Sequence, residues 1–348
     1  MMTKLVTGLT LAVLFAIAAP LLYLRLFQVN IPRMTRRFHF PENLLYSTRF
    51  PIILRAFLSG NNRVIRPFLR LQKVRASLES EDPFYKGFAY EGTGMGFGAK
   101  ASLWPGRGRR FERYIRELDP LYLYQYYVGL GWWLHIRYRY RFGGYRKWME
   151  TLDPRYAHIV FDGVGFRAAL FESQEDPSVH LQFEKFPLDC RRVCLQGYGR
   201  GLWFVSQFNL EAAVAAIEQL PASYRQDTYS GLGLAVAYSL FDRIPFGIES
   251  QARVPSGYRA SYCQGMAFGW EARKLQSEGF WYEQLESFTD EYAKCAERYV
   301  DWVREAEVLM KHRAEDFGSY YTRWMDQMRM LLKQRGTPQD GSEKEACC

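Results

Sequence analysis

The sequence lacks the short motifs by which many enzymes are recognised. It has no phosphate-binding P-loop, no Gly-x-Ser-x-Gly nucleophile elbow, no His-Glu-x-x-His zinc motif and no Cys-x-x-Cys pair. Its five histidines are scattered, so each is interpreted as a surface or core residue. These absences argue against the common phosphoryl-transfer, serine-hydrolase and zinc-protease mechanisms.

Cysteine is also scarce, and its spacing shows no disulfide framework. Cys190 and Cys194 are one helical turn apart, but no further Cys or His follows at the spacing of metal ligands. The sequence therefore predicts no metal and no cofactor. It favours inert thiols in a reducing compartment.

Acidic residues are nearly missing from residues 25–75, where Glu42 is the only one. The same stretch holds ten arginines and one lysine, and the whole chain has a net charge of +9. An apolar segment adjoins this basic stretch. We therefore expect anionic lipid rather than nucleic acid as its partner.

A single long apolar run, Leu5–Leu24, contains 20 residues without a charge. That length can span a bilayer. The alternative is a signal peptide cleaved after Ala16-Ile17-Ala18. Because one Lys precedes the run and a row of Arg follows it, the positive-inside rule places the rest of the chain on the cytoplasmic side. We predict a single-pass membrane anchor over residues 1–27.

What the sequence does contain is an internal repeat of 34 residues. Glycines recur at Gly129, Gly163, Gly197, Gly231 and Gly265. Two positions further on, the column contains glycine in four of the five copies and alanine in the last. An earlier glycine pair, Gly92 and Gly94, lies three residues out of register. Such spacing is typical of repeat proteins.

Each unit is predicted to be a pair of helices. The clearest copy has a short helix from Asn209, a plausible N-cap, to Leu220, and a long helix from Pro221 to about Leu240. The glycines fall in the middle of the long helices, where each costs roughly 1 kcal/mol against alanine. Close approach of neighbouring helices would offset that repeated cost.

The predicted fold is all-α: an elongated, solenoid-like array of about six 34-residue helix pairs with an N-terminal transmembrane helix and a C-terminal capping helix. The array occupies residues 83–297, and capping helices occupy 298–335. Residues 28–82 form a basic juxtamembrane segment or a plain linker. The polar tail, 336–348, is predicted to be disordered.

One column of the repeat is polar. The residue before the first glycine reads Glu91, Val128, Asp162, Gln196, Ser230 and Gln264 in successive units. One interpretation is a binding stripe that includes Gln196 and Gln264. The alternative is that these side chains bond neighbouring helices. Asp162 and Glu91 are the candidate catalytic acids, but two units separate them by roughly 20 Å. A catalytic carboxylate pair works at about 5–9.5 Å.

Aromatic residues cluster in the second unit, among them Tyr126, Trp132 and Trp133. They could form a pocket for an apolar, unsaturated ligand. The alternative is that they belong to the core.

The segments FDGVGFRAALFE (161–172), LQGYGRGLWFV (195–205) and YSGLGLAVAYS (229–239) are similar to those of the DUF1702 family, a bacterial family of unknown function. Its members occur beside polyketide synthases in enediyne biosynthetic clusters. The resemblance implies a role accessory to specialised metabolism, with a hydrophobic polyene as a possible ligand. It assigns no catalytic residue.

Two functions follow as expectations. The first is a membrane-anchored accessory protein that binds a lipophilic intermediate, such as a polyketide, or a protein partner in a groove of the array. The second is an enzyme of unfamiliar type, a cyclase or isomerase acting on a polyene, with Asp162 or Glu91 as the acid.

Overall fold

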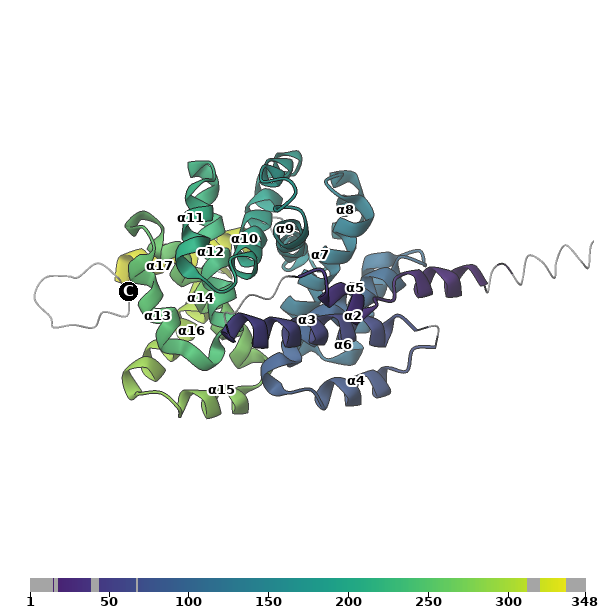
Figure 1. Cartoon of the computed structure of the whole chain (residues 1–348), viewed down its shortest axis with the longest axis horizontal. Helices are drawn as coiled ribbons and strands as arrows, with labels where there is room; N and C mark the ends of the chain where they lie inside the picture. The colour runs from purple at the N-terminus through teal and green to yellow at the C-terminus, as the bar shows by residue number, and fades with distance from the viewer. Residues whose placement is uncertain (1–14, 16–17, 39–43, 67, 312–319, 336–348) are drawn as a thin grey trace, which may run out of the picture.

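Long helices that carry the glycines form the framework of the protein. The computed structural model describes residues 15, 18–38, 44–66, 68–311 and 320–335, and Figure 1 shows that its regular elements are helices. The long helices of the array are α3 (Leu44–Val64), α5 (Pro83–Ala101), α7 (Leu123–Tyr138), α9 (Val160–Phe171), α10 (Leu188–Val205), α12 (Ala222–Ser239) and α14 (Arg259–Gln276).

Shorter helices connect or flank the long ones. They are α2 (Ile31–Thr35), α4 (Leu71–Glu79), α6 (Arg107–Leu118), α8 (Phe142–Met149), the 3-10 helix Val179–Lys185, α11 (Leu210–Glu218), α13 (Ile244–Ser250) and α15 (Glu278–Leu285). Two longer helices, α16 (Asp290–Lys311) and α17 (Tyr320–Arg335), follow the array. The helix pair predicted around Pro221 is confirmed, and the Asn209 side chain caps α11 by accepting from the amide of Ala212.

The glycine pairs lie where neighbouring helices touch. A Cβ atom added to Gly197 would lie 1.8 Å from the carbonyl oxygen of Asp162 on the preceding helix. One added to Gly199 would lie 1.9 Å from the carbonyl oxygen of Thr228 on the following helix. The other units repeat this arrangement. The first glycine of each pair therefore lets the previous helix approach closely, and the second lets the next helix approach. This close packing is the compensation that we expected for the cost of glycine in the middle of a helix.

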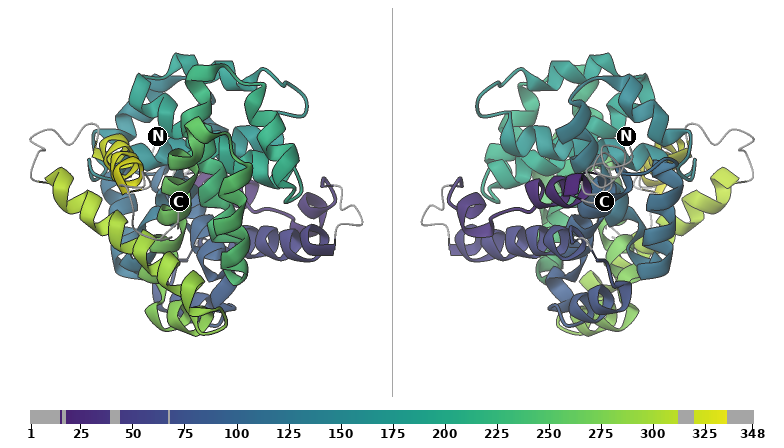
Figure 2. Two further views of the ribbon diagram at one scale, coloured as in Figure 1. Left: turned by 90° about the vertical axis from the view of Figure 1, so that its left-hand side faces the viewer. Right: turned by 90° about the vertical axis from the view of Figure 1, so that its right-hand side faces the viewer.

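The array is not the elongated solenoid that the repeat predicts, because it curls until α14 touches α5. Helices α5, α7, α9, α10, α12 and α14 pack in that order. The Arg273 guanidinium of α14 then donates to the carbonyl oxygen of Phe84 on α5 at 2.7 Å. The Phe88 ring of α5 also contacts the Tyr238 ring of α12, with the centroids 5.1 Å apart. We call these six helices the ring; Figure 2 views the molecule from both ends of its long axis.

The predicted membrane anchor requires correction. Within the part of the chain that the structure describes, no helix combines the length and apolar character needed to cross a membrane. Of the predicted span, residues 5–14 and 16–17 lie outside the described part. In the remainder, Leu24 is buried in the protein core, and Tyr23 and Phe27 pack against Trp133 of α7. These side chains contact protein, so the predictions of a transmembrane helix and of single-pass membrane localisation are wrong.

The segment interpreted as juxtamembrane contains a helix of the array. A Cβ atom added to Gly60 of α3 would lie 1.9 Å from the carbonyl oxygen of Ala89 on α5, which is the same contact that the repeats use. Beyond the array, α16 and α17 pack against α14 and against each other. The tail over 336–348, predicted to be disordered, lies outside the described residues.

Candidate functional site

The inner face of the ring and α17 together line a small, partly open cavity. The cavity has about 50 Å³ of space for the centres of water-sized molecules. Its wall consists of Glu91, Tyr124, Gln125, Val128, Ile159, Asp162, Arg200, Leu234, Tyr238, Phe268, Gly269, Glu271, Ala272, Tyr321 and Trp324. Every helix of the ring contributes to this wall.

Arg200 organises the polar end of the cavity. Its guanidinium lies over the Phe166 ring, 4.6 Å from the centroid, and donates to the Asp162 carboxylate. A second nitrogen of the same guanidinium lies 3.4 Å from Glu91 Oε2. Glu91 and Asp162 thus share one partner, and the expected separation of roughly 20 Å is wrong. The straight stacking assumed for that distance fails because the array curls.

Part of the polar column forms hydrogen bonds between neighbouring helices. This is the alternative to a binding stripe that the sequence left open. Gln196 of α10 donates to Asp162 Oδ2 at 3.0 Å and to the Tyr321 hydroxyl of α17 at 2.8 Å. Ser230 of α12 donates to Gln196 Oε1 at 3.3 Å. Gln196 therefore fixes the back of the cavity by linking α9, α10, α12 and α17.

Of the two acids predicted from sequence, Glu91 accepts fewer hydrogen bonds than Asp162. The Glu91 side chain is buried, and Oε1 accepts no hydrogen bond of normal geometry. The buried indole N–H of Trp132, which also lacks a partner of normal geometry, faces the same carboxyl. Burial raises the pKa of this carboxyl from 4.5 to about 7, and the negative charge of Asp162 also raises it. Arg200 and the N–H of Trp132 lower the same pKa. The protonation of Glu91 therefore changes near neutral pH, the range in which a general acid or base is most useful.

Two further acceptors on the wall lack donors. Gln125 Oε1 is buried and accepts no hydrogen bond, and none of the described residues donates one to the partly exposed carboxylate of Glu271. Burial raises the pKa of Glu271 to about 7, although Arg304 lowers it and Glu307 raises it. The cavity thus has a titratable carboxyl on α5 and another on α14.

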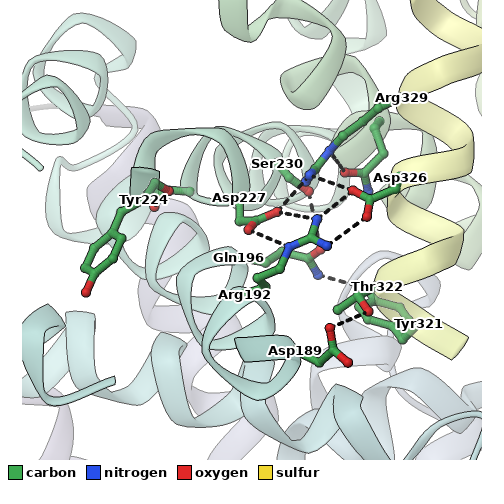
Figure 3. Close-up of polar contacts among 12 residues, drawn as sticks. Asp189, Arg192, Gln196, Tyr224, Asp227, Ser230, Tyr321, Thr322, Asp326 and Arg329 are labelled. Carbon is green, nitrogen blue, oxygen red and sulfur yellow. Dashed lines mark hydrogen bonds and ion pairs between the residues drawn. The ribbon is translucent and has the colours of Figure 1, made fainter. Parts of the chain in front are cut away.

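Gln264, the other predicted binding residue of the column, lies in a second polar cluster that attaches α17 to the ring. It accepts from Arg329 of α17 at 3.1 Å, and Arg329 also pairs with Asp227 of α12 at 2.7 Å. Arg192 of α10 bridges Asp227 and Asp326, at 3.0 and 2.6 Å. Figure 3 shows Arg192, Asp227, Asp326 and Arg329 of this cluster converging between the helices. Gln264 therefore holds α17 in place and does not line the cavity.

The aromatic residues predicted to bind a ligand lie in the core, as the alternative interpretation expects. Trp132 packs on Phe57 of α3, and Trp133 donates to Ser102 Oγ at 2.9 Å. Tyr126 is fully buried and packs against Tyr90. None of the three lines the cavity. Its aromatic wall comes from Tyr124, Tyr238, Phe268, Tyr321 and Trp324.

Sequence reasoning missed Arg200, Glu271 and the α17 cluster. A signal for Arg200 exists in the sequence, because it is a cation between two glycines and lies one helical turn after Gln196. No comparable signal marks Glu271, since the repeat register does not show that α14 returns to α5. Among the described residues, no group of three or more His, Cys, Asp or Glu side chains could hold a metal ion.

The sequence from residue 20 to residue 331 matches the profile of a family described as a protein of unknown function (DUF1702). No curated protein and no solved structure matches the chain.

Proposed function

Since the chain belongs to the DUF1702 family of proteins of unknown function, we propose its function from the geometry of the cavity: the protein binds a small organic ligand inside its ring. The observation that carries this proposal is the pair of buried acceptors without donors, Glu91 Oε1 and Gln125 Oε1. Leaving such a group unpaired costs about 1–3 kcal/mol. A ligand that donates to them would recover that free energy.

The composition of the wall supports ligand binding. Apolar and aromatic side chains, such as Val128, Leu234 and Phe268, face a few polar groups at Glu91 and Arg200. Small-molecule sites combine an apolar wall with a few placed polar groups in this way. A cavity of about 50 Å³ takes a short molecule or one end of a longer one. The proposed ligand is therefore smaller than a whole polyene.

The biological setting is part of the proposal. The resemblance of the repeated segments to a family found in enediyne clusters supports a role accessory to specialised metabolism. A small, largely apolar cavity inside the ring suits a protein that holds and shields a reactive or lipophilic intermediate. The small size of the cavity, about 50 Å³, supports a small molecule over a protein partner.

The test of binding uses a variant that fills the cavity. Leu234→Trp places a large ring in the space, and Val308→Trp at an exposed site is its matched control. Native mass spectrometry of protein purified from its own host should show a bound small molecule on the wild type and on Val308→Trp. The molecule should be missing from Leu234→Trp. Equal occupancy of all three proteins contradicts the proposal.

An acid–base enzyme is the second candidate function, and the pKa of about 7 at Glu91 favours it. General acid–base groups contribute about 10²–10⁴-fold to rate. Glu91→Gln preserves the shape of the side chain but cannot exchange a proton at neutral pH. In a complemented deletion strain, product loss of that size with normal protein levels supports an enzyme. A change below about tenfold supports a binding protein. Asp162→Asn tests the other predicted acid in the same assay.

A further inference from the structure

We infer that the ligand is a small organic cation, a protonated amine, whose ammonium group lies between Glu91 and Glu271. This inference rests on the proposed function, because it names the class of ligand that the cavity takes. It follows from the charges, the unpaired acceptors and the aromatic rings of the wall.

The charges on the wall do not balance. Three carboxyl groups, Glu91, Asp162 and Glu271, face the cavity against one guanidinium, that of Arg200. Arg200 is already paired with Asp162 and lies 3.4 Å from Glu91. The wall can thus carry an excess of negative charge that a cationic ligand would neutralise. Outside the wall, Arg304 of α16 also acts on Glu271, but the one guanidinium on the wall is already paired with Asp162. An anionic ligand would therefore meet repulsion from the carboxylates.

The hydrogen-bonding groups also require a donor-rich ligand. Glu91 Oε1 and Gln125 Oε1 are unpaired acceptors, and the Glu271 carboxylate receives no hydrogen bond from the described residues. An ammonium group supplies three donors and no acceptor. It can donate to several of these groups at once. A carboxylate or phosphate ligand could accept from the unpaired Nε of Arg200, but it would lie against three carboxyl groups.

The rest of the wall is suited to an organic cation rather than a metal ion. Aromatic side chains, including Phe268, Tyr321 and Trp324, line the cavity beside the carboxyl groups. Ring faces attract organic cations and pack against their apolar carbons. The volume of about 50 Å³ limits the enclosed part to a few heavy atoms, so butylamine is a suitable probe.

Binding of a cation should release protons. Arg200, Asp162 and Tyr238 face Glu91, and Arg304, Glu307, Tyr124 and Tyr156 face Glu271. Because burial raises the pKa of both glutamates to about 7, each is roughly half protonated at pH 7. An ammonium ion stabilises the ionised forms. Affinity should therefore increase from pH 5 to pH 8.

The experiment compares three probes of similar shape: butylamine, 1-butanol and butyrate. Isothermal titration calorimetry of the full chain should show that butylamine binds more tightly than the other two. Its affinity should rise at least tenfold between pH 5 and pH 8. At pH 7, titrations in buffers of different ionisation enthalpy should show net proton release. Glu91→Gln and Glu271→Gln should each weaken butylamine binding about tenfold, and the exposed Glu283→Gln control should not.

The wild-type titrations alone can overturn the inference. No binding of butylamine at millimolar concentration overturns it, and so does binding of 1-butanol that equals or exceeds that of butylamine. Neither result removes the proposed function, which fails separately if Leu234→Trp leaves the occupancy of the purified protein unchanged.

Discussion

Glu91 gives the protein a pH dependence that can be measured without a ligand. Its pKa is raised by burial from 4.5 to about 7, so the folded chain holds a proton that the unfolded chain releases between these values. The stabilising contribution is fully present below pH 4.5 and is lost as pH rises through 7. The loss is about 3 kcal/mol. We expect Glu91→Gln to become more stable relative to wild type, by about this amount, between pH 4.5 and pH 8.

Urea unfolding across that pH range measures the effect. Glu283→Gln, at an exposed position, is the control and should follow the wild-type curve. Wild-type and Glu91→Gln curves that stay parallel would show that Glu91 titrates as an ordinary surface carboxyl.

The glycine contacts predict opposite outcomes for the same substitution at two positions. A Cβ atom at Gly197 would overlap the Asp162 carbonyl, whereas one at Gly279 of α15 meets nothing within 4 Å. Gly197→Ala should lower the free energy of unfolding by about 1–3 kcal/mol or more, because the ring helices must separate. Gly279→Ala should leave it unchanged or raise it by up to about 1 kcal/mol. An increased melting temperature for Gly197→Ala would contradict the packing described here.

The repeat register predicted which residues share a column, but not what each contacts. Asp162, Gln196 and Ser230 hydrogen-bond between adjacent helices, as a column of stacked units should. Glu91 instead reaches across the ring to Arg200, 109 residues later in the chain. Periodicity gives the order of neighbours. A contact across the ring depends on curvature, which no local pattern specifies.

At the scale of the element, α17 is held to the ring by ionic contacts that differ in burial. Arg329 is buried and binds Asp227 and Gln264, whereas Arg335 pairs with Glu305 near the surface. Arg329→Met leaves Asp227 with fewer partners and should cost about 3–5 kcal/mol, as breaking a buried pair does. Arg335→Met should cost less than about 1 kcal/mol.

Chemical denaturation with far-UV circular dichroism measures both variants. Limited proteolysis locates the effect: cleavage within α17 should be faster in Arg329→Met than in Arg335→Met. Equal stability of the two variants would mean that the cluster in Figure 3 contributes little to the attachment of α17.

The positions of the helices could be predicted from the sequence, because glycine, proline and capping residues repeat at fixed positions. The α11–α12 pair begins and ends within two residues of its predicted limits. The N-terminal segment was misjudged for a physical reason. Hydrophobicity shows that Tyr23, Leu24 and Phe27 avoid water, but it does not distinguish lipid from the surface of α7.

At the scale of the whole molecule, the touching ends should make unfolding cooperative. In an open solenoid each repeat contacts only its neighbours, and part of the array can unfold alone. Here α5 and α14 are joined, so we expect Gly92→Ala and Gly231→Ala to shift one shared transition. In both glycines an added Cβ would lie 1.7 Å from a carbonyl oxygen of the preceding helix.

Tryptophan fluorescence and far-UV circular dichroism should therefore give coincident urea curves for the wild type and for both variants. Two separate transitions, of which each variant moves only one, would show that the array unfolds in parts.

The contact between Arg273 and Phe84 also bears on the order in which the protein folds. Adjacent ring helices are about 34 residues apart, but this contact joins residues separated by 189 positions. Loop-closure entropy makes the longer connection costlier by about 1.5 kcal/mol, so neighbouring helices should dock before the ends meet. The cavity exists only after that last step. A nascent or truncated chain could thus be largely helical and still have no binding site, which would couple ligand capture to completion of folding.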